Sequence, residues 1–248
     1  MELRAPEWVD RVTSTNTVLL ERLGAGERLP DGFVLAAREQ TAGRGRGRHA
    51  WRSQPGRDLS CSLVLAAPDD PLRVPSLALA VALGAAAALE ELGVRARTKW
   101  PNDVIAGGRK IAGILPERSA SRGADRAGAL VVGIGLNVNM SGAEAAAIDQ
   151  PATSILAETG RPAPVPEVLE GLLRALSPRL AAWRAGGFAA LSPEWSRRCV
   201  GLGRPVEVAD GVTRRRGILA GFGARGQLLL RQPDGRTVEV WSGSLILS

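Results

Sequence analysis

Two lysines stand out among the basic residues of this chain. Of 32 basic residues in 248, only Lys99 and Lys110 are lysines, and all the others are arginines. Arginine carries a delocalised charge that it does not lose, whereas lysine presents a compact ammonium that can point at one reacting atom. Both lysines fall in one short stretch, which indicates that the chemistry of the chain takes place there. Chance survival in an Arg-rich composition is the alternative interpretation.

A carboxylate and the second lysine are expected to meet across a hairpin. Asp103 ends the segment Lys99-Trp100-Pro101-Asn102-Asp103, and Lys110 follows after a Gly-Gly turn. The turn at 106–109 predicts a hairpin that brings Asp103 and Lys110 to the same end of a sheet. Asp103 can hold a magnesium ion or accept a proton, and the pair suits group transfer at phosphorus. A strand that simply ends in a Pro-Asn turn is the alternative.

A Gly/Arg run precedes these residues in the chain. It reads Gly43-Arg44-Gly45-Arg46-Gly47-Arg48 and follows Gln40. Glycines let a backbone approach an anion closely, and guanidinium groups match phosphate and carboxylate geometry. The run predicts a loop that folds over a nucleotide, although it lacks the G-x-x-x-x-G-K-[ST] pattern of a phosphate loop. Nonspecific RNA binding is the alternative, and Trp51 is the one nearby residue for base stacking.

Two weaker motifs flank the stronger ones. Thr13-Ser14-Thr15-Asn16 opens a predicted helix, where one residue serves as N-cap and its neighbours offer hydroxyl and amide groups to a polar ligand. Gly133-Ile134-Gly135-Leu136-Asn137 lies in a predicted strand, where glycines indicate close approach of a ligand or of another backbone. The Asn137 amide is suited to reading an adenine edge. A Gly-rich core strand against a helix explains the second motif equally well.

The elements that position these motifs alternate between helix and strand. Hydrophobic spacing and capping signals predict helices over 14–23, 76–92 and 166–183, with Ser192 as the N-cap of a further helix. Apolar runs predict strands over 33–37, 59–66, 95–100 and 130–139, which indicates an α/β or α+β core with a mixed sheet. Five short strands between 205 and 247 predict a small antiparallel barrel, with a boundary near Arg198.

The composition narrows the classes of function without choosing one. The net charge of +7 comes from arginines dispersed along the chain, so a nucleic acid, ATP or an acidic protein would each be attracted. One histidine and two cysteines in unrelated contexts argue against a zinc site. No export signal is evident, and the apolar stretch 76–89 is too short for a membrane span. We therefore expect a cytoplasmic protein that does not enter membranes.

Taken together, in this order, the four motifs resemble those of the biotin protein ligases, over roughly Val12 to Gly160. The resemblance implies an α+β fold: a mixed-sheet catalytic domain of the class II synthetase/biotin ligase type at 1–198, and a C-terminal SH3-like barrel at 199–248. The catalytic residues that it implies are Lys110, Arg46 and Asp103, and Asp103 is also a candidate ligand of Mg²⁺. The implied biotin-binding residues are Ser14, Thr15, Asn16, Gln40, Arg44, Gly45, Arg46 and Lys110. The implied ATP- or adenylate-binding residues are Arg44, Arg46, Arg48, Trp51, Lys99, Asn102 and Asn137.

One stretch of the loop departs from the family pattern. The family continues Gly-Arg-Gly-Arg-x-Gly-Arg before its Trp, whereas here the second half is shifted by one residue. Trp51 keeps its usual distance from Gly43. The shift leaves open whether Arg48 takes the role of the family's last loop arginine.

The function that the resemblance implies is ATP-dependent attachment of biotin to a lysine of a biotin carboxyl carrier protein, through biotinyl-5'-AMP. Lipoate or octanoate attachment on a related fold is the nearest alternative, and an RNA-binding module is a more distant one. The implied protein is a monomer or homodimer. Because the first of these motifs begins within the first fifteen residues of the chain, we expect no helix-turn-helix domain before it and no specific DNA binding.

Overall fold

A seven-stranded mixed sheet forms the centre of the molecule. The computed structural model describes residues 1–47, 49–119, 128–148 and 150–247. The strands follow the order β1-β2-β3-β7-β6-β5-β4. Only the pairing of β1 with β2 is parallel among the described residues of this sheet. The strands are β1 (Glu7–Val12), β2 (Phe33–Gln40), β3 (Leu59–Ala66), β4 (Ala96–Lys99), β5 (Asp103–Ala106), β6 (Arg109–Arg118) and β7 (Ala129–Leu136).

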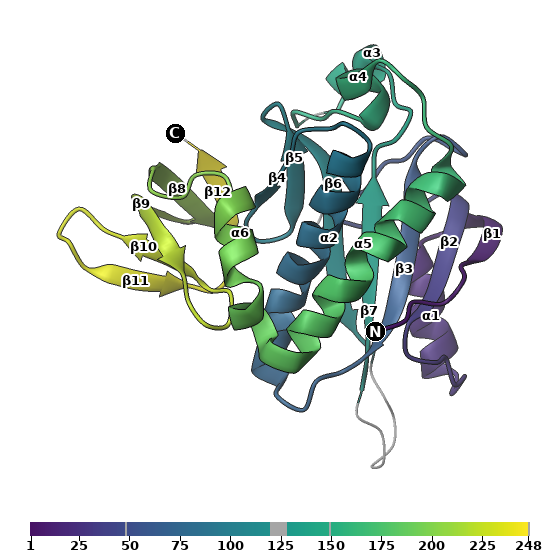
Figure 1. Cartoon of the computed structure of the whole chain (residues 1–248), viewed down its shortest axis with the longest axis horizontal. Coiled ribbons are helices and arrows are strands. Elements are labelled where there is room, and N and C mark those ends of the chain that lie inside the picture. Colours follow the sequence, from purple (N-terminus) through teal and green to yellow (C-terminus); the bar gives the residue numbers. More distant parts are fainter. Residues whose placement is uncertain (48, 120–127, 149, 248) are drawn as a thin grey trace.

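Helices cover both faces of this sheet (Figure 1). Helix α1 (Thr15–Gly24) packs through Leu19 against Leu35, Val64 and Val131 on one face. The alternate residues of the same strands face the other side, where they meet α2 (Leu77–Glu91) and α5 (Val165–Gly186). The predicted mixed sheet and the predicted helices are therefore confirmed.

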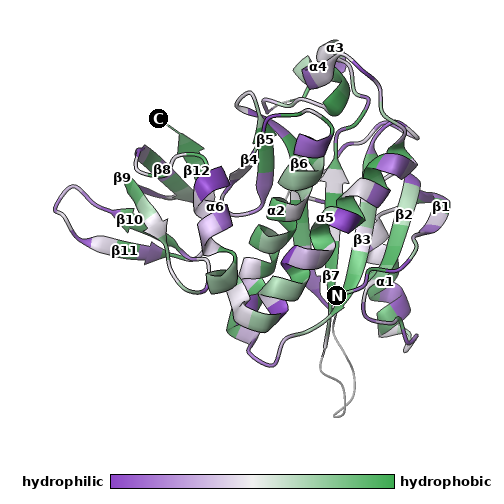
Figure 2. Ribbon diagram, in the orientation of Figure 1, coloured by the Kyte–Doolittle hydropathy of each residue, from purple (hydrophilic) through white to green (hydrophobic). Residues whose placement is uncertain are grey.

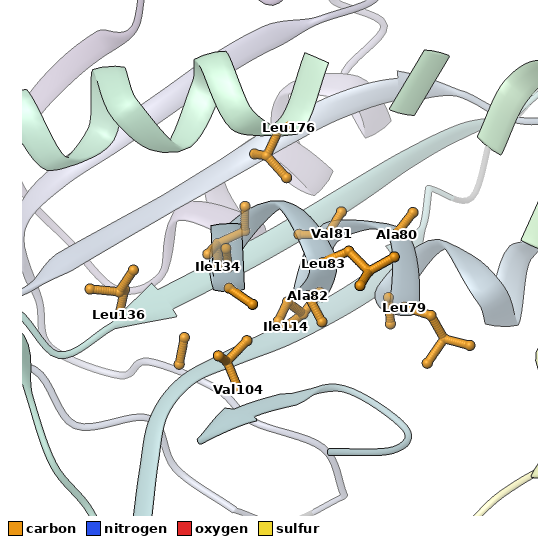
Figure 3. Packing of buried hydrophobic residues seen from close by; sticks show 14 of the residues in the cluster. Leu79, Ala80, Val81, Ala82, Leu83, Val104, Ile114, Ile134, Leu136 and Leu176 are labelled. Atoms are coloured by element: carbon orange, nitrogen blue, oxygen red, sulfur yellow. The ribbon is translucent and has the colours of Figure 1, made fainter. Parts of the chain in front are cut away.

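Helix α2 is the buried helix of the core. Twelve of its 15 residues are buried, and Figure 3 shows it between Leu176 of α5 and the strand residues Val104, Ile114, Ile134 and Leu136. Gly84 allows α5 to approach closely, because a Cβ there would lie 2.5 Å from Leu176 Cδ2. In Figure 2, α2 and the strands behind it are coloured mostly toward the hydrophobic end of the scale.

The apolar segment that contains α2 is longer than the sequence analysis assumed. Helix η1 (Pro71–Ser76) precedes α2, and Pro71–Glu91 together make 21 residues that are apolar and long enough to cross a membrane. The prediction that its length excludes a span was therefore wrong. Its place is nevertheless the core, because 72% of its most apolar window is buried inside the protein.

The chain then passes through short helices to a second sheet. These helices are α3 (Gly142–Ala146), α4 (Ile155–Thr159), η2 (Gly187–Ala190) and α6 (Ser192–Arg198). The five predicted C-terminal strands form an antiparallel sheet in the order β11-β10-β9-β8-β12. They are β8 (Pro205–Asp210), β9 (Thr213–Phe222), β10 (Leu228–Arg231), β11 (Thr237–Val240) and β12 (Ser244–Leu247).

The second sheet packs firmly on the first part of the chain. Phe188, Trp195 and Phe222 meet edge to face with centroids 5.8 to 6.2 Å apart, and Trp100 Nε1 donates to the Gly226 carbonyl at 3.1 Å. The predicted N-cap at Ser192 was wrong. The N-cap of α6 is Leu191, and Ser192 already belongs to the helix, because the preceding 3-10 turn η2 leads directly into α6.

Candidate functional site

The predicted chemical residues surround a cavity beside the central strands β3, β6 and β7. The cavity measures about 140 Å³. Its walls come from the start of α1, the loop after β2, the β5–β6 hairpin and strand β7, with one residue from the second sheet. The lining residues from the sequence analysis are Ser14, Thr15, Asn16, Gln40, Arg44, Gly45, Arg46, Trp51, Asn102, Asp103 and Lys110.

The start of α1 supplies a buried network of hydrogen bonds. Thr15 donates to Gln40 Oε1 from its backbone N–H (2.8 Å) and from its hydroxyl (3.0 Å). Ser62 Oγ lies 2.6 Å from both Thr15 Oγ1 and Asn16 Oδ1. Ser14 is the N-cap of α1 by backbone conformation, but its side chain makes no capping hydrogen bond. Its buried hydroxyl therefore remains available to a polar ligand in the cavity.

Glu117 joins this network to the Gly/Arg loop. Its Oε2 atom accepts from Asn16 Nδ2 and from Arg44 Nη2, both at 2.7 Å. The close approach of Asn16 requires Gly133, where a Cβ would lie 2.6 Å from Asn16 Oδ1. Glu117 was not predicted, because nothing in the local sequence marks a carboxylate whose partners lie 73 and 101 residues away.

A second glycine of β7 receives the loop tryptophan. A Cβ on Gly135 would lie 2.1 Å from Trp51 Cε2, so the indole ring packs directly against the strand. Gly113 borders the same ring, with its Cβ position 3.2 Å from Trp51 Cζ3. The motif glycines thus admit the side chains of Asn16 and Trp51, where the sequence analysis had proposed a ligand or a backbone. The indole N–H is buried and has no hydrogen-bond partner among the described residues.

The hairpin brings Lys110 and Asp103 together as predicted. Lys110 Nζ lies 2.7 Å from Asp103 Oδ1 and 5.7 Å from the centre of the Trp51 ring. Both side chains are about one-fifth exposed, so the pair is largely shielded yet faces the cavity. Asn102 is buried beside it and donates to the Ile114 carbonyl at 2.9 Å. Lys99 lies opposite Asp103 in the backbone register of strands β4 and β5. Its side chain lines neither this cavity nor the second cavity described below.

Arg46 reaches from the loop to the second sheet. Its Nη1 atom donates to the Gly243 carbonyl (3.0 Å) and to Asn102 Oδ1 (3.3 Å). Burial lowers the pKa of Arg46, while the nearby carboxylates of Asp103 and Asp210 raise it. The guanidinium remains charged, since even a lowered arginine pKa stays far above neutrality. Arg48, the remaining loop arginine of the sequence analysis, lies outside the described residues.

A second cavity of about 380 Å³ adjoins the first one. Asn137 lines it and donates from Nδ2 to the Thr153 carbonyl at 2.9 Å, which leaves Oδ1 to accept from a ligand. The Lys110 backbone bonds to Pro151 and Thr153, which fixes this lysine against the same wall. The lining residues shared by the two cavities are His49, Ala50, Trp51, Lys110 and Gln150.

The site offers few ligands to a metal ion. Within the described ranges no group of three or more His, Cys, Asp or Glu side chains could hold a metal. Burial raises the pKa of the thiols of Cys61 and Cys199 to about 12, so neither is a reactive nucleophile. The arrangement instead suits the meeting of two anions beside an ammonium, with arginines to neutralise charge.

Comparison with known protein families gives a match over the central sheet and the site. Residues 8–137 match the Biotin/lipoate A/B protein ligase family. The biotin--[acetyl-CoA-carboxylase] ligase of Paracoccus denitrificans is 36% identical over 242 residues, which cover 92% of this chain and 95% of that protein. The ligase of the same name from Mycobacterium tuberculosis is 34% identical, covering 96% and 87%. The bifunctional ligase/repressor BirA of Escherichia coli is 33% identical, covering 95% of this chain and 71% of that protein.

Solved structures agree with these relatives. The biotin protein ligase from Aquifex aeolicus in complex with biotin and ATP superposes with a TM-score of 0.81, with 30% identity and 98% of each chain covered. The biotin protein ligase from Leishmania major in complex with biotinyl-5-AMP gives a TM-score of 0.64 at 25% identity, with 95% of this chain and 98% of that one covered.

Proposed function

The chain belongs to the Biotin/lipoate A/B protein ligase family and, within it, to the biotin protein ligases, and from this membership we propose the reaction that it catalyses. Biotin and ATP form biotinyl-5'-AMP and pyrophosphate. The amine of a lysine on a biotin carboxyl carrier domain then takes the biotinyl group and releases AMP. The observation that carries this proposal is the position of Lys110, whose ammonium faces both cavities and is held by Asp103.

The first cavity is suited to biotin. The ureido group of biotin has one carbonyl acceptor and two N–H donors, and Ser14, Thr15 and Asn16 present hydroxyl and amide groups at one end of the cavity. Ile114 and Ile134 supply apolar wall for the rest of the molecule. At the opposite end the biotin carboxylate would reach Lys110.

The second cavity is suited to the adenylate. Asn137 Oδ1 is placed to accept from the exocyclic amine of adenine, because Nδ2 is already committed to Thr153. Trp51 lines both cavities and offers a ring for stacking on the purine. The α-phosphate would then lie where the two cavities meet, beside Lys110, with Arg44 and Arg46 approaching from the loop.

The first half-reaction brings two negative groups together. A biotin carboxylate oxygen attacks the α-phosphorus, a new O–P bond forms, and pyrophosphate leaves with the electron pair of the broken O–P bond. The Lys110 ammonium reduces the repulsion between carboxylate and phosphate and stabilises the charge that develops in the transition state. Asp103 keeps the ammonium at that point.

The second half-reaction removes AMP. The carrier lysine must be a free amine when it attacks the biotinyl carbonyl, and it loses a proton as the amide bond forms. Asp103 is the carboxylate nearest to this point and is the candidate to take the proton. Arg44 and Arg46 hold the adenylate phosphate and exclude water until the carrier arrives.

Mg²⁺ fits this site only when the triphosphate of ATP supplies most of its ligands. Asp103 offers a single carboxylate that already contacts Lys110, and magnesium sites of this kind combine one or two carboxylates with substrate phosphates. When bound, the ion would neutralise charge on the departing pyrophosphate.

Further parts of the proposal concern the whole protein. We assign the catalytic domain to 1–198 and an SH3-like domain to 199–248, and we propose that the protein is a monomer or a homodimer. Both cysteines are free and buried, as suits the reducing cytoplasm. The partner is the carrier domain of a biotin-dependent carboxylase.

Mass spectrometry of a carrier domain incubated with the enzyme, biotin and ATP tests the function. We expect one biotinyl group on the carrier, lost when ATP is omitted or when the acceptor lysine of the carrier is replaced by arginine. Lipoate in place of biotin should give no product. Modification by lipoate and not by biotin would contradict the proposal.

A further inference from the structure

The second sheet takes part in the site through one short segment. Ser244 lines the first cavity, and the neighbouring Gly243 accepts a hydrogen bond from Arg46 at 3.0 Å. Gly243 lies 197 positions from Arg46 in the sequence. Arg46 also bonds to Asn102 in the turn between β4 and β5, so one guanidinium links the loop, this turn and the second sheet.

The segment 242–244 is itself held in place by β8. Gly243 has a φ of +123°, and a Cβ there would lie 2.8 Å from the Ala209 carbonyl, so only glycine fits. Ser242 Oγ donates to Asp210 Oδ2 at 2.5 Å, and Ser244 pairs with Ala209. The Gly243 carbonyl is therefore a fixed acceptor, and the Asp210 carboxylate next to it attracts the same guanidinium.

We propose that the 242–244 segment of the second sheet is a positioning element for Arg46 and keeps the Gly/Arg loop closed over the site. In the reaction proposed above, this contact would retain biotinyl-5'-AMP until the carrier lysine attacks. Gly243 and Asp210 act through Arg46 and do not touch the reacting atoms. The second sheet is then part of the catalytic unit.

The variant Gly243→Ala tests the contact directly. The added methyl group must displace the segment from Ala209 and carry the carbonyl away from Arg46. Gly235→Ala is its matched control. Gly235 also has a positive φ (+84°), but no atom lies within 4 Å of its Cβ position. It lies in the β10–β11 turn, at the opposite edge of the second sheet from β12. Thermal melting shows whether both variants remain folded.

Two measurements separate a positioning role from a general loss of stability. The first is the rate at which trypsin cuts the ligand-free enzyme after the arginines of the loop. The second is the AMP that forms when biotinyl-5'-AMP escapes from the enzyme and is hydrolysed by water to biotin and AMP, measured with biotin and ATP but no carrier, relative to the rate of adenylate formation. For Gly243→Ala we expect both cleavage and AMP release to rise about tenfold, since a hydrogen bond from a charged donor contributes on this order. Adenylate formation should fall by a smaller factor than AMP release rises, because Lys110 and Asp103 keep their positions.

The controls define what would overturn the proposal. Equal cleavage of the parent and of folded Gly243→Ala, or an equal rise in Gly235→Ala, contradicts it. If Gly243→Ala does not fold, Asp210→Asn decides, because it removes the charge and keeps an oxygen for Ser242. Cleavage should then rise about threefold, against no change in the exposed same-sheet control Asp234→Asn, and equality of the two overturns the proposal.

The two proposals fail in distinguishable ways. Loop cleavage is measured without substrates, so it reports on the contact whatever the enzyme binds. If the parent forms no biotinylated carrier, the proposed function fails while the loop result stands. If the carrier is biotinylated but cleavage is unchanged in both test variants, only the positioning role is wrong.

Discussion

Lys110 carries its charge on a compact ammonium group, whereas the arginines around it carry theirs on planar guanidinium groups. Its ammonium lies 2.7 Å from Asp103 Oδ1 and is fixed at the backbone by bonds to Pro151 and Thr153. A planar guanidinium at this position would be too wide to sit between a carboxylate and a phosphate oxygen while keeping the Asp103 contact.

We therefore expect Lys110→Arg to bind biotin with a modest loss of affinity and to form adenylate at least about 100-fold more slowly, as when one transition-state donor is removed. Pyrophosphate release measures the first half-reaction, and calorimetric titration measures biotin binding. Pyrophosphate release near the parent rate would show that Lys110 is not the catalytic ammonium.

Gly135 is a second position where a single added carbon atom would change the geometry of the site. We expect Gly135→Ala to expel Trp51 from its place on β7, because the new Cβ would lie 2.1 Å from the ring. Affinity for ATP should fall at least about tenfold in titration calorimetry, since the indole lines both cavities. Gly221→Ala, in β9 with no atom within 4 Å of its Cβ position, is the control and should bind as the parent does. Unchanged ATP affinity in Gly135→Ala would contradict the role of the indole.

At the scale of elements, we propose that the Gly/Arg loop acts as a lid over the adenylate. Arg46→Gly removes both of its anchors, on Asn102 and on Gly243. We expect biotinyl-5'-AMP to escape and to label lysines of bystander proteins, which a blot of an added unrelated protein detects. Arg236→Gly, in the distant β10–β11 hairpin, provides the control. If Arg46→Gly labels only the carrier, the loop does not retain the intermediate.

The packing of α2 on α5 predicts that replacing a glycine by alanine lowers the free energy of unfolding at one position and raises it at another. Gly84→Ala should lower the free energy of unfolding by about 1 to 3 kcal/mol, because its Cβ would lie 2.5 Å from Leu176 Cδ2 and 3.1 Å from Leu176 Cα. Gly171→Ala on α5 should raise it by about 0.5 to 1 kcal/mol, since only the tip of Arg174 is near. Thermal and urea unfolding measure both. Two changes of the same sign would show that the close approach of the helices is not what Gly84 provides.

The elements that the sequence predicted well are those with strong apolar patterning. The strand 59–66 matches β3, and α2 differs from its predicted range by one residue at each end, because both are buried along nearly their whole length. Strand β1 was not predicted. It lies at the edge of the sheet, is only partly buried and carries charged residues, so it lacks the alternation that marks a strand.

The site was predictable where its residues lie close in sequence. The meeting of Asp103 and Lys110 followed from a short hairpin whose turn could be recognised. Glu117, Ser62 and Ser244 were missed because their roles arise only when distant strands come together. Lys99 shows the opposite case, since a motif suggested a role while its strand places it outside both cavities.

At the scale of the whole molecule, we propose that the low lysine content limits self-modification of the enzyme. A reactive acyl-adenylate acylates nearby amines, and the only side-chain amines are Lys99 and Lys110. Lys110 is paired with Asp103, and a protonated ammonium has no lone pair for attack. We expect very little self-biotinylation even with excess biotin and ATP.

Adding lysines tests this expectation. Arg38→Lys and Arg52→Lys should become biotinylated near the loop, as peptide mass spectrometry would locate, whereas Arg236→Lys in the far hairpin should label much less. If the first two variants are biotinylated no more than the parent, the scarcity of lysine does not limit self-biotinylation and reflects composition alone.

The burial of α2 also has a consequence for synthesis of the chain. Its partner α5 ends at Gly186, about 95 residues after the end of α2 at Glu91, and the ribosome needs roughly 5 to 20 s to add that length. During this interval the apolar face of α2 that α5 later covers remains exposed. The nascent chain is therefore most prone to aggregate, and most dependent on chaperones, before α5 emerges. Slow translation between 92 and 165 would prolong that exposure, whereas a pause after 186 would allow the core to close.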